Sequence, residues 1–154
     1  MVVQDRIERE ISIAAPVARV WEVITEPGHV GAWFGTDGKP AELDELRPGG
    51  RMVVDHGEHG VFPMRIVAVE PPRAFSYRWA PGFPGAEVTE DNSTLVEFTL
   101  RDEGVGTLLR IVETGFAALP AEVAARKYED NSGGWTHMAE RVRDYTENGG
   151  KLPG

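Results

Sequence analysis

One long amphipathic segment near the C-terminus constrains the fold more than any other feature of the sequence. Segment 120–148 begins with Pro120, which suits the first turn of a helix, and ends at Asn148-Gly149-Gly150. Its apolar residues recur at helical spacing, namely Tyr128, Trp135, Met138, Val142 and Tyr145. A helix of this length with one apolar face needs a broad apolar surface to cover that face. Gly133-Gly134 predicts a kink or a close approach, because each glycine costs about 1 kcal/mol relative to alanine in a helix interior.

The preceding segments predict the surface that the helix covers. Short stretches of alternating polarity are separated by Gly, Pro and Asp/Asn turns, a pattern typical of an antiparallel sheet. We expect strands at 6–13, 51–56, 61–70, 75–79, 94–101 and 107–114, with a further edge strand inside 37–46. Short helices are expected at 17–25 and 29–34, and a long loop at 80–92. The chain is therefore predicted to be a single α+β domain over 1–154, with one curved sheet and one long helix.

Composition excludes several classes of function. The 154 residues include no cysteine, which excludes a disulfide scaffold, cysteine-based zinc and iron–sulfur sites and a thiol nucleophile. The formal net charge of −9 argues against a nucleic-acid partner, because an acidic surface repels phosphate. The N-terminus is charged within six residues and no long apolar run follows, so neither a signal peptide nor a membrane contact is expected. These features predict a cytoplasmic protein.

Five short motifs in order carry a family resemblance. They are Thr25-Glu26-Pro27 to Trp33-Phe34-Gly35, Pro48-Gly49-Gly50, Val69-Glu70-Pro71-Pro72-Arg73 to Tyr77-Arg78-Trp79, Gly106-Thr107 to Thr114-Gly115-Phe116, and Gly134-Trp135. Together they resemble the bacterial proteins similar to the C-terminal domain of the activator of Hsp90 ATPase. The resemblance covers nearly the whole chain and implies the START-like (SRPBCC) helix-grip fold, with a six- to seven-stranded antiparallel sheet around the C-terminal helix. It also implies a pocket for an apolar or aromatic small molecule.

A curved sheet that grips a helix leaves a wedge-shaped space, lined by inward side chains of both elements. Strand alternation places Phe75, Tyr77 and Trp79 on one face, and we expect this face to point inward. The predicted ligand-binding residues are Trp33, Phe62, Met64, Phe75, Tyr77, Trp79, Phe98, Ile111, Glu113, Tyr128, Trp135 and Met138.

Glu113 is the anomaly among these residues, because it shares its strand parity with Leu109 and Ile111. An inward carboxylate is paired, or neutral through a raised pKa, or in contact with a wet cavity. Two locations are open: a solvated position at the pocket mouth, and a position in contact with a ligand. Glu113 is the candidate catalytic residue.

The remaining polar motifs predict less. His56-Gly57-Glu58-His59 has two histidines three residues apart, but we expect a solvated hairpin tip and no metal site. His137 lies next to the apolar stripe and is expected at the surface. Neither a nucleophile elbow nor a phosphate loop occurs, so a triad hydrolase is not supported and no cofactor is expected.

Three functions are carried forward from the sequence. The first is a module that binds an apolar or aromatic small molecule. The second is an enzyme of the polyketide aromatase, cyclase or hydrolase type, in which Glu113 acts with Tyr77 or His137. The third, implied by family analogy alone, is an Hsp90-type co-chaperone or stress-response protein. The sequence leaves open whether the protein forms a homodimer. We rank the binding module first.

Overall fold

The structure is a computed structural model that describes residues 5–35 and 39–150. Within these residues, seven strands form one antiparallel sheet with the order β1-β7-β6-β5-β4-β3-β2. The strands are β1 (Arg6–Ile13), β2 (Glu42–Leu43), β3 (Arg51–Asp55), β4 (Val61–Glu70), β5 (Ala74–Trp79), β6 (Thr94–Asp102) and β7 (Thr107–Thr114). The helices are α1 (Val17–Thr25), α2 (Pro27–Trp33) and α3 (Ala121–Glu147), with short 3-10 turns at Gly57–His59 and Phe116–Ala118. The predicted α+β helix-grip fold is confirmed.

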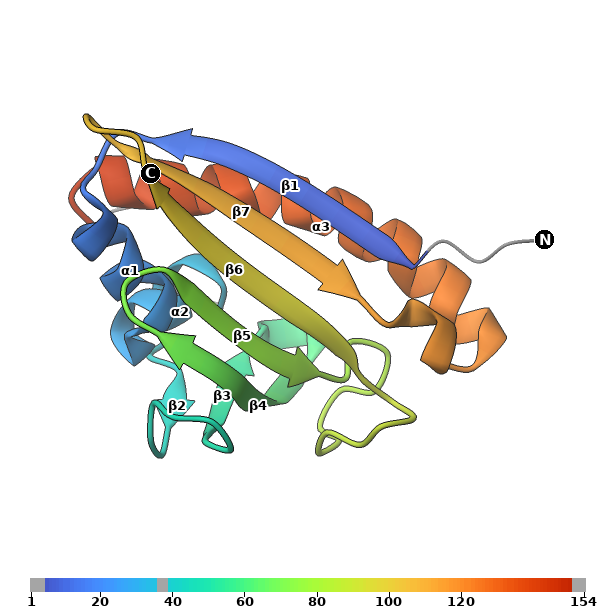
Figure 1. The fold of residues 1–154 in the computed structure, drawn as a ribbon. Coiled ribbons are helices and arrows are strands. Elements are labelled where there is room, and N and C mark those ends of the chain that lie inside the picture. The colour runs from blue at the N-terminus through green and yellow to red at the C-terminus, as the bar shows by residue number, and fades with distance from the viewer. Residues whose placement is uncertain (1–4, 36–38, 151–154) are drawn as a thin grey trace.

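Helix α3 covers one face of the sheet and runs alongside the edge strand β1 (Figure 1). The first strand reaches this edge by pairing with the last, so that Ile7 lies opposite Glu113 and Ile13 opposite Thr107. Arg9 ties the edge to the helix, because its Nη2 donates to the carbonyl oxygen of Ser132 at 2.7 Å and to the Ser132 hydroxyl at 2.9 Å. The helix is thus held at the edge of the sheet as well as over its face.

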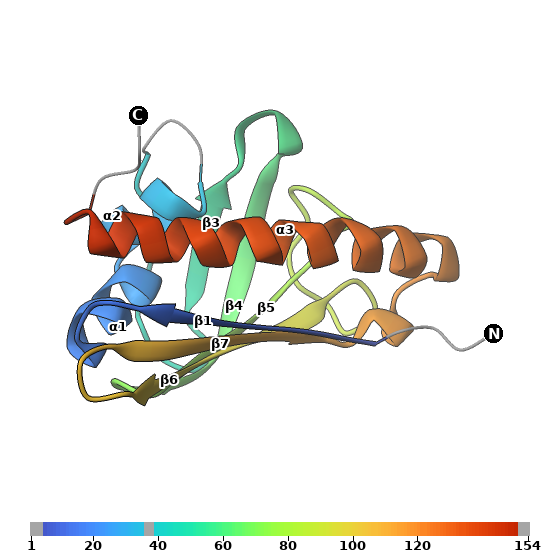
Figure 2. The ribbon, with the colours of Figure 1, turned by 90° about the horizontal axis from the view of Figure 1, so that it is seen from above.

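The two short helices fill one end of the space between the sheet and α3, as the view from above shows (Figure 2). Trp33 at the end of α2 is fully buried, and its indole N–H donates to the carbonyl oxygen of Val23 in α1 at 2.8 Å. Its ring packs edge-on against Phe98 of β6 at a centroid distance of 6.3 Å. We call this region of α1, α2, Trp33 and Phe98 the closed end.

The further edge strand expected inside 37–46 is confirmed as Glu42–Leu43, and residues 36–38 lie outside the described part of the chain. Two details differ from the sequence predictions. Helix α2 begins at Pro27, two residues earlier than expected, because proline suits the first helical position. Helix α3 runs through Gly133 and Gly134 without interruption, and a Cβ added at either would meet nothing within 4 Å. The prediction of a kink or a close approach at this pair is wrong.

Candidate functional site

A cavity of about 440 Å³ lies between the middle of α3 and the sheet. Its lining comes from the end of α2, the β3–β4 turn, the end of β5 with the loop after it, and one face of α3. The lining residues are Phe34, His56, His59, Phe62, Trp79, Pro81, Lys127, Asp130, Asn131, Gly134, Trp135 and Met138. This volume falls within the range of small-molecule sites, about 300–1,000 Å³. We call this space the central cavity.

Four aromatic rings form a continuous wall of the central cavity. Phe34 stacks on Trp135 at 5.7 Å between ring centroids and lies 5.5 Å from Trp79. Phe62 also lies 5.5 Å from Trp79, and the two indoles are 6.2 Å apart. Ring contacts at these distances add favourable energy beyond the burial of area. The wall is therefore a connected apolar surface.

The face of α3 that lines the central cavity changes from polar to apolar along its length. Lys127, Asp130, Asn131, Gly134, Trp135 and Met138 follow steps of three and one, which place them on a single helical face. The Nζ of Lys127 lies 3.5 Å from Oδ2 of Asp130, and the Asp130 side chain is 56% exposed. At Gly134 no side chain fills the space beside the helix. The charges thus lie toward solvent, and the helix backbone itself borders the space.

The loop after β5 closes one side of the rim and is packed tightly at two points. A Cβ added at Gly82 would lie 2.5 Å from Cγ1 of Val123 on α3. A Cβ at Gly60 would lie 2.6 Å from Cβ of Pro84. The N–H of Gly85 also donates to the carbonyl oxygen of Val61 at 2.6 Å. These contacts dock the loop against both α3 and the β3–β4 turn.

His56 lines the central cavity and is a site residue that the sequence reading missed. Its ring packs edge-on against Phe34 at 4.6 Å and against Phe62 at 5.2 Å. Burial lowers its pKa from 6.5 to about 4, with a smaller contribution from the charge of His59, so the ring is neutral at pH 7. Its Nε2 is buried and has no hydrogen-bond partner among the described residues.

The expectation of a solvated hairpin tip therefore holds for His59, which is exposed, and is wrong for His56. The reason is strand parity. His56 continues the inward alternation of Met52 and Val54 by one more step beyond the end of β3. Extending the alternation by that step was the signal available in the sequence.

Glu113 is fully buried and accepts four hydrogen bonds from side chains. Its Oε1 accepts from Nδ2 of Asn131 at 3.0 Å and from the indole N–H of Trp135 at 2.8 Å. Its Oε2 accepts from the indole N–H of Trp79 at 2.8 Å and from the hydroxyl of Thr94 at 2.6 Å. Burial raises the pKa of Glu113, and the four donors partly offset that rise. The carboxyl group therefore has all four of its acceptor positions occupied.

Glu113 itself does not line the central cavity. It lies behind the wall formed by Trp79 and Trp135, where it meets neither solvent nor the open space. The structure therefore places it in neither of the two locations considered from the sequence.

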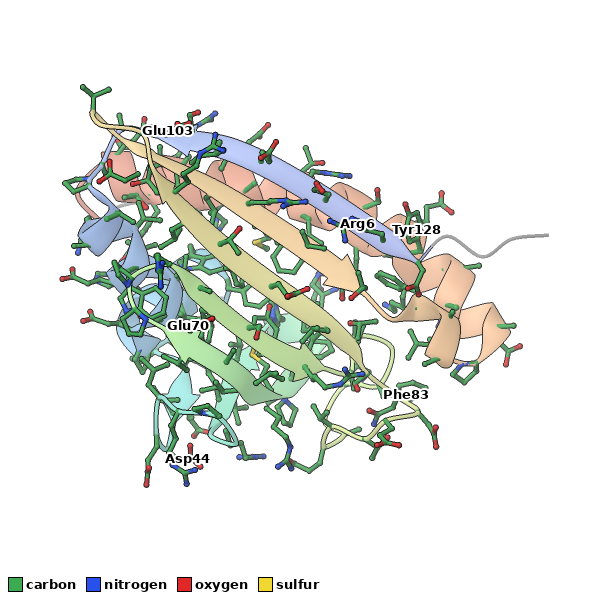
Figure 3. The ribbon with its side chains drawn as sticks, in the orientation of Figure 1. Arg6, Asp44, Glu70, Phe83, Glu103 and Tyr128 are labelled. Carbon is green, nitrogen blue, oxygen red and sulfur yellow. The ribbon has the colours of Figure 1, made fainter. Side chains whose placement is uncertain are left out.

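The structure divides the other predicted ligand-binding residues into two groups. Those that line the central cavity are Phe62, Trp79, Trp135 and Met138. Those packed elsewhere are Trp33, Met64, Phe75, Tyr77, Phe98, Ile111 and Tyr128. Tyr128 packs edge-on against Phe116, and its hydroxyl donates to the carbonyl oxygen of Arg6 at 3.1 Å, beside the start of β1 (Figure 3).

Besides His56, the predicted ligand-binding residues omitted the lining residues Phe34, His59, Pro81, Lys127, Asp130, Asn131 and Gly134. Asn131 and Gly134 lie four residues and one residue before Trp135 on the same face of α3, so helical spacing around Trp135 was the signal that identifies them.

The acid–base candidates do not share a common space. The Tyr77 hydroxyl is buried without a hydrogen-bond partner among the described residues, and burial, with the nearby Glu113 charge, raises its pKa well above the ordinary value. His137 is exposed on α3 and does not line the central cavity. In the described part of the chain, no group of three or more His, Asp or Glu side chains is placed to hold a metal ion. None of the described helices is both long enough and apolar enough to span a bilayer.

Solved structures of other proteins share this architecture. DynU16, a protein of the dynemicin biosynthetic locus, is 28% identical with a TM-score of 0.72; the match covers 95% of this chain and 48% of DynU16. The chain thus spans about half the length of DynU16. CalU16 from Micromonospora echinospora is 25% identical with a TM-score of 0.68, and the match covers 97% of this chain and 68% of CalU16. The Aha1 dimer structure from Colwellia psychrerythraea is 16% identical with a TM-score of 0.70, covers 98% and 99% of the two chains, and supports the fold alone.

A comparison with curated proteins gives no match. A family comparison does, and it covers residues 14–147, from the end of β1 to the end of α3. That span includes the aromatic wall, the loop of the rim and the carboxylate behind the wall. The chain belongs to the family of activator of Hsp90 ATPase homolog 1-like proteins.

Proposed function

We propose that the protein binds an apolar or aromatic small molecule in the central cavity. The observation that carries this proposal is the continuous wall of Phe34, Phe62, Trp79 and Trp135 around about 440 Å³ of space. Burial of apolar ligand surface against such a wall contributes about 25 cal/mol per Å². The similarity to DynU16, from a biosynthetic locus, supports a small-molecule role.

The arrangement favours binding over catalysis. Two titratable side chains that pack against the aromatic wall have a buried polar atom without a hydrogen-bond partner among the described residues: neutral His56, which lines the cavity, and Tyr77, which does not. The carboxyl group of Glu113, behind the wall, accepts from four donors, and that of Asp130, on the cavity lining, is paired with Lys127. A ligand would therefore meet ring surfaces and the imidazoles of His56 and His59, with the Lys127–Asp130 ion pair also on the lining.

Titration with the uncharged fluorophore N-phenyl-1-naphthylamine tests the proposal. Gly134→Leu places a side chain in the open space beside the helix, and Gly133→Leu is the matched control, because Gly133 lies in the same helix but does not line the central cavity. We expect the wild type and Gly133→Leu to bind the probe with similar affinity. Gly134→Leu should lose about tenfold or more, equivalent to about 1.4 kcal/mol.

The same proteins should agree in a thermal-shift experiment, since a ligand that binds only the folded state raises the apparent stability by RT ln(1 + [L]/Kd). The proposal is contradicted if the wild type binds neither this probe nor any member of a panel of fatty acids, sterols, flavonoids and aromatic polyketides. Equal binding by the two leucine variants would place the ligand elsewhere.

A further inference from the structure

The two indoles of the cavity wall direct their N–H groups at the same carboxylate. Trp79 donates to one oxygen of Glu113 and Trp135 to the other, each at 2.8 Å. Trp79 comes from the end of β5 and Trp135 from the middle of α3, so the carboxylate joins the sheet to the helix at the cavity wall. Glu113 stands on β7, opposite Val96 of β6 and Ile7 of β1.

The other two donors complete the set of four hydrogen bonds to the Glu113 carboxylate, and they come from neighbouring positions. Thr94 opens β6, and Asn131 lies one helical turn before Trp135. An amide oxygen in place of the carboxylate offers two acceptor positions, and only an ionised carboxyl group accepts from all four donors at once. The chemistry of the donor set therefore calls for a carboxylate here.

Trp33 shows that a buried indole in this fold does not need a charged acceptor. Its N–H is satisfied by the carbonyl oxygen of Val23 at 2.8 Å, within the closed end. The helices hold a backbone acceptor of this kind in place, and it requires no buried charge. Burying a carboxylate is costly even when it is hydrogen-bonded, so stability alone gives a weak reason to place one behind Trp79 and Trp135.

We propose that Glu113 is a positioning residue of the central cavity: it fixes both indoles so that their rings, and not their N–H groups, face the ligand. This inference rests on the proposed function. It assigns Glu113 to the aromatic wall, without contact to the ligand. It also narrows the class of ligand, because the indole N–H groups are already hydrogen-bonded to Glu113. Trp79 and Trp135 therefore offer a ligand only their ring surfaces. The ligand is thus recognised at this wall by its shape and its planar or apolar surface.

Indole N–H signals in ¹H–¹⁵N NMR spectra of the wild type test the link without any substitution or ligand. The chain has four tryptophans. We expect the signals of Trp79 and Trp135 to shift together with one midpoint above 4.5, the ordinary glutamate value, because burial raises the pKa of Glu113. The signal of Trp33, bonded to a backbone carbonyl, should not follow that midpoint.

The groups around Glu113 and the two indoles decide how this titration is assigned. His56 also titrates in the acid range: its ring centroid lies 6.3 Å from that of Trp79, and its pKa of about 4 places its midpoint below the one expected for Glu113. Tyr77 on β5 is the ionisable group whose charge couples to Glu113, and burial raises the Tyr77 pKa far above the range of the experiment. The partners on β6 and α3 are the uncharged Thr94, Asn131 and Trp135. Ile7 on β1 is apolar. Separate midpoints for Trp79 and Trp135, or no shift of either, would overturn the proposal.

Probe affinity supplies the second readout. Glu113→Gln leaves donors without acceptors and should weaken binding of N-phenyl-1-naphthylamine by about tenfold. Thr94→Val is the matched control, since it removes one donor from the same carboxylate and leaves both indole hydrogen bonds in place; we expect a change within about twofold. A folded Glu113→Gln protein with unchanged affinity would overturn the positioning role. Failure of the wild type to bind would instead count against the proposed function, whatever the NMR result.

Discussion

The closed end and the central cavity lie between the same sheet and the same helix, yet they are built differently. At the closed end α1 and α2 insert Trp33 against Phe98, and the indole N–H finds a backbone acceptor. At the central cavity no helix fills the space, and two indoles share a buried carboxylate instead. The first region is packed by added chain, and the second is kept open by a side-chain network.

This difference shows where stability and function are separated in the fold. Side chains at the closed end contact neighbours on all sides, so a deletion there leaves an enclosed void. Side chains of the cavity wall contact neighbours on one side and open space on the other. We therefore expect the two regions to respond differently to the same substitution.

The largest effect is expected from Phe98→Ala, compared with Phe62→Ala. Both residues point inward from strands of the same sheet, but Phe98 packs on Trp33 and Phe75 while Phe62 lines the central cavity. Phe98→Ala should lower the free energy of unfolding by about 3–5 kcal/mol. The loss for Phe62→Ala should be smaller than this by about 1–2 kcal/mol, because that substitution enlarges an existing space. Urea unfolding measures both, and equal losses would remove the distinction between the two regions.

Acid sensitivity from His56 is the next largest effect. The pKa of His56 is about 4 in the folded protein and 6.5 in the unfolded chain. The unfolded state therefore binds more protons between these values, and this contribution to stability is complete above pH 6.5 and lost as the pH falls to 4. The free energy of unfolding should fall by at most about 3 kcal/mol across that window.

His56→Phe should abolish that loss. The measurement is the free energy of unfolding of the variant minus that of the wild type, determined at pH 7 and again at pH 4.5, and the two differences are compared. Taking the difference cancels Glu113, whose raised pKa acts in the opposite direction because the folded state then binds more protons. His137→Gln is the control, since His137 is exposed on α3. A His56→Phe protein as acid-sensitive as the wild type would contradict the buried neutral imidazole.

The smallest effect concerns the glycine pair of α3. Gly133→Ala and Gly134→Ala should each stabilise the protein by about 0.5–1 kcal/mol, because both positions are helical and a Cβ at either has open space. Thermal unfolding of the two single variants measures this gain. A loss of stability at Gly134 alone would mean that the wall of the central cavity is packed more tightly there than the structure describes.

The fold was largely predictable because its signals are local. Alternation set the bounds 6–13, 61–70 and 107–114, and these match β1, β4 and β7. The apolar stripe on α3 and the proline that precedes it set the long helix to within one residue at each end. The edge strand β2 was located only to within 37–46, because two residues leave no periodic pattern to measure.

The candidate site was less predictable, for two physical reasons. Periodicity along a strand or helix identifies inward residues but not whether a neighbour fills the space beside them, so Trp33 on α2 and Trp135 on α3 look equivalent in sequence. Parity also placed Glu113 inward, and the structure agrees, but the four donors that meet it come from β5, β6 and α3. Their convergence depends on how the helix lies over the sheet, which no local spacing encodes.

The wall of the central cavity has a practical consequence. Two of the four tryptophans of the chain, Trp79 and Trp135, line the space, while Trp33 lies in the closed end and Trp21 packs edge-on against Phe75. Two of the four indole fluorophores of the protein therefore lie beside the space that a bound molecule would fill. The emission of these two indoles can report occupancy of the central cavity on the purified protein, without a label.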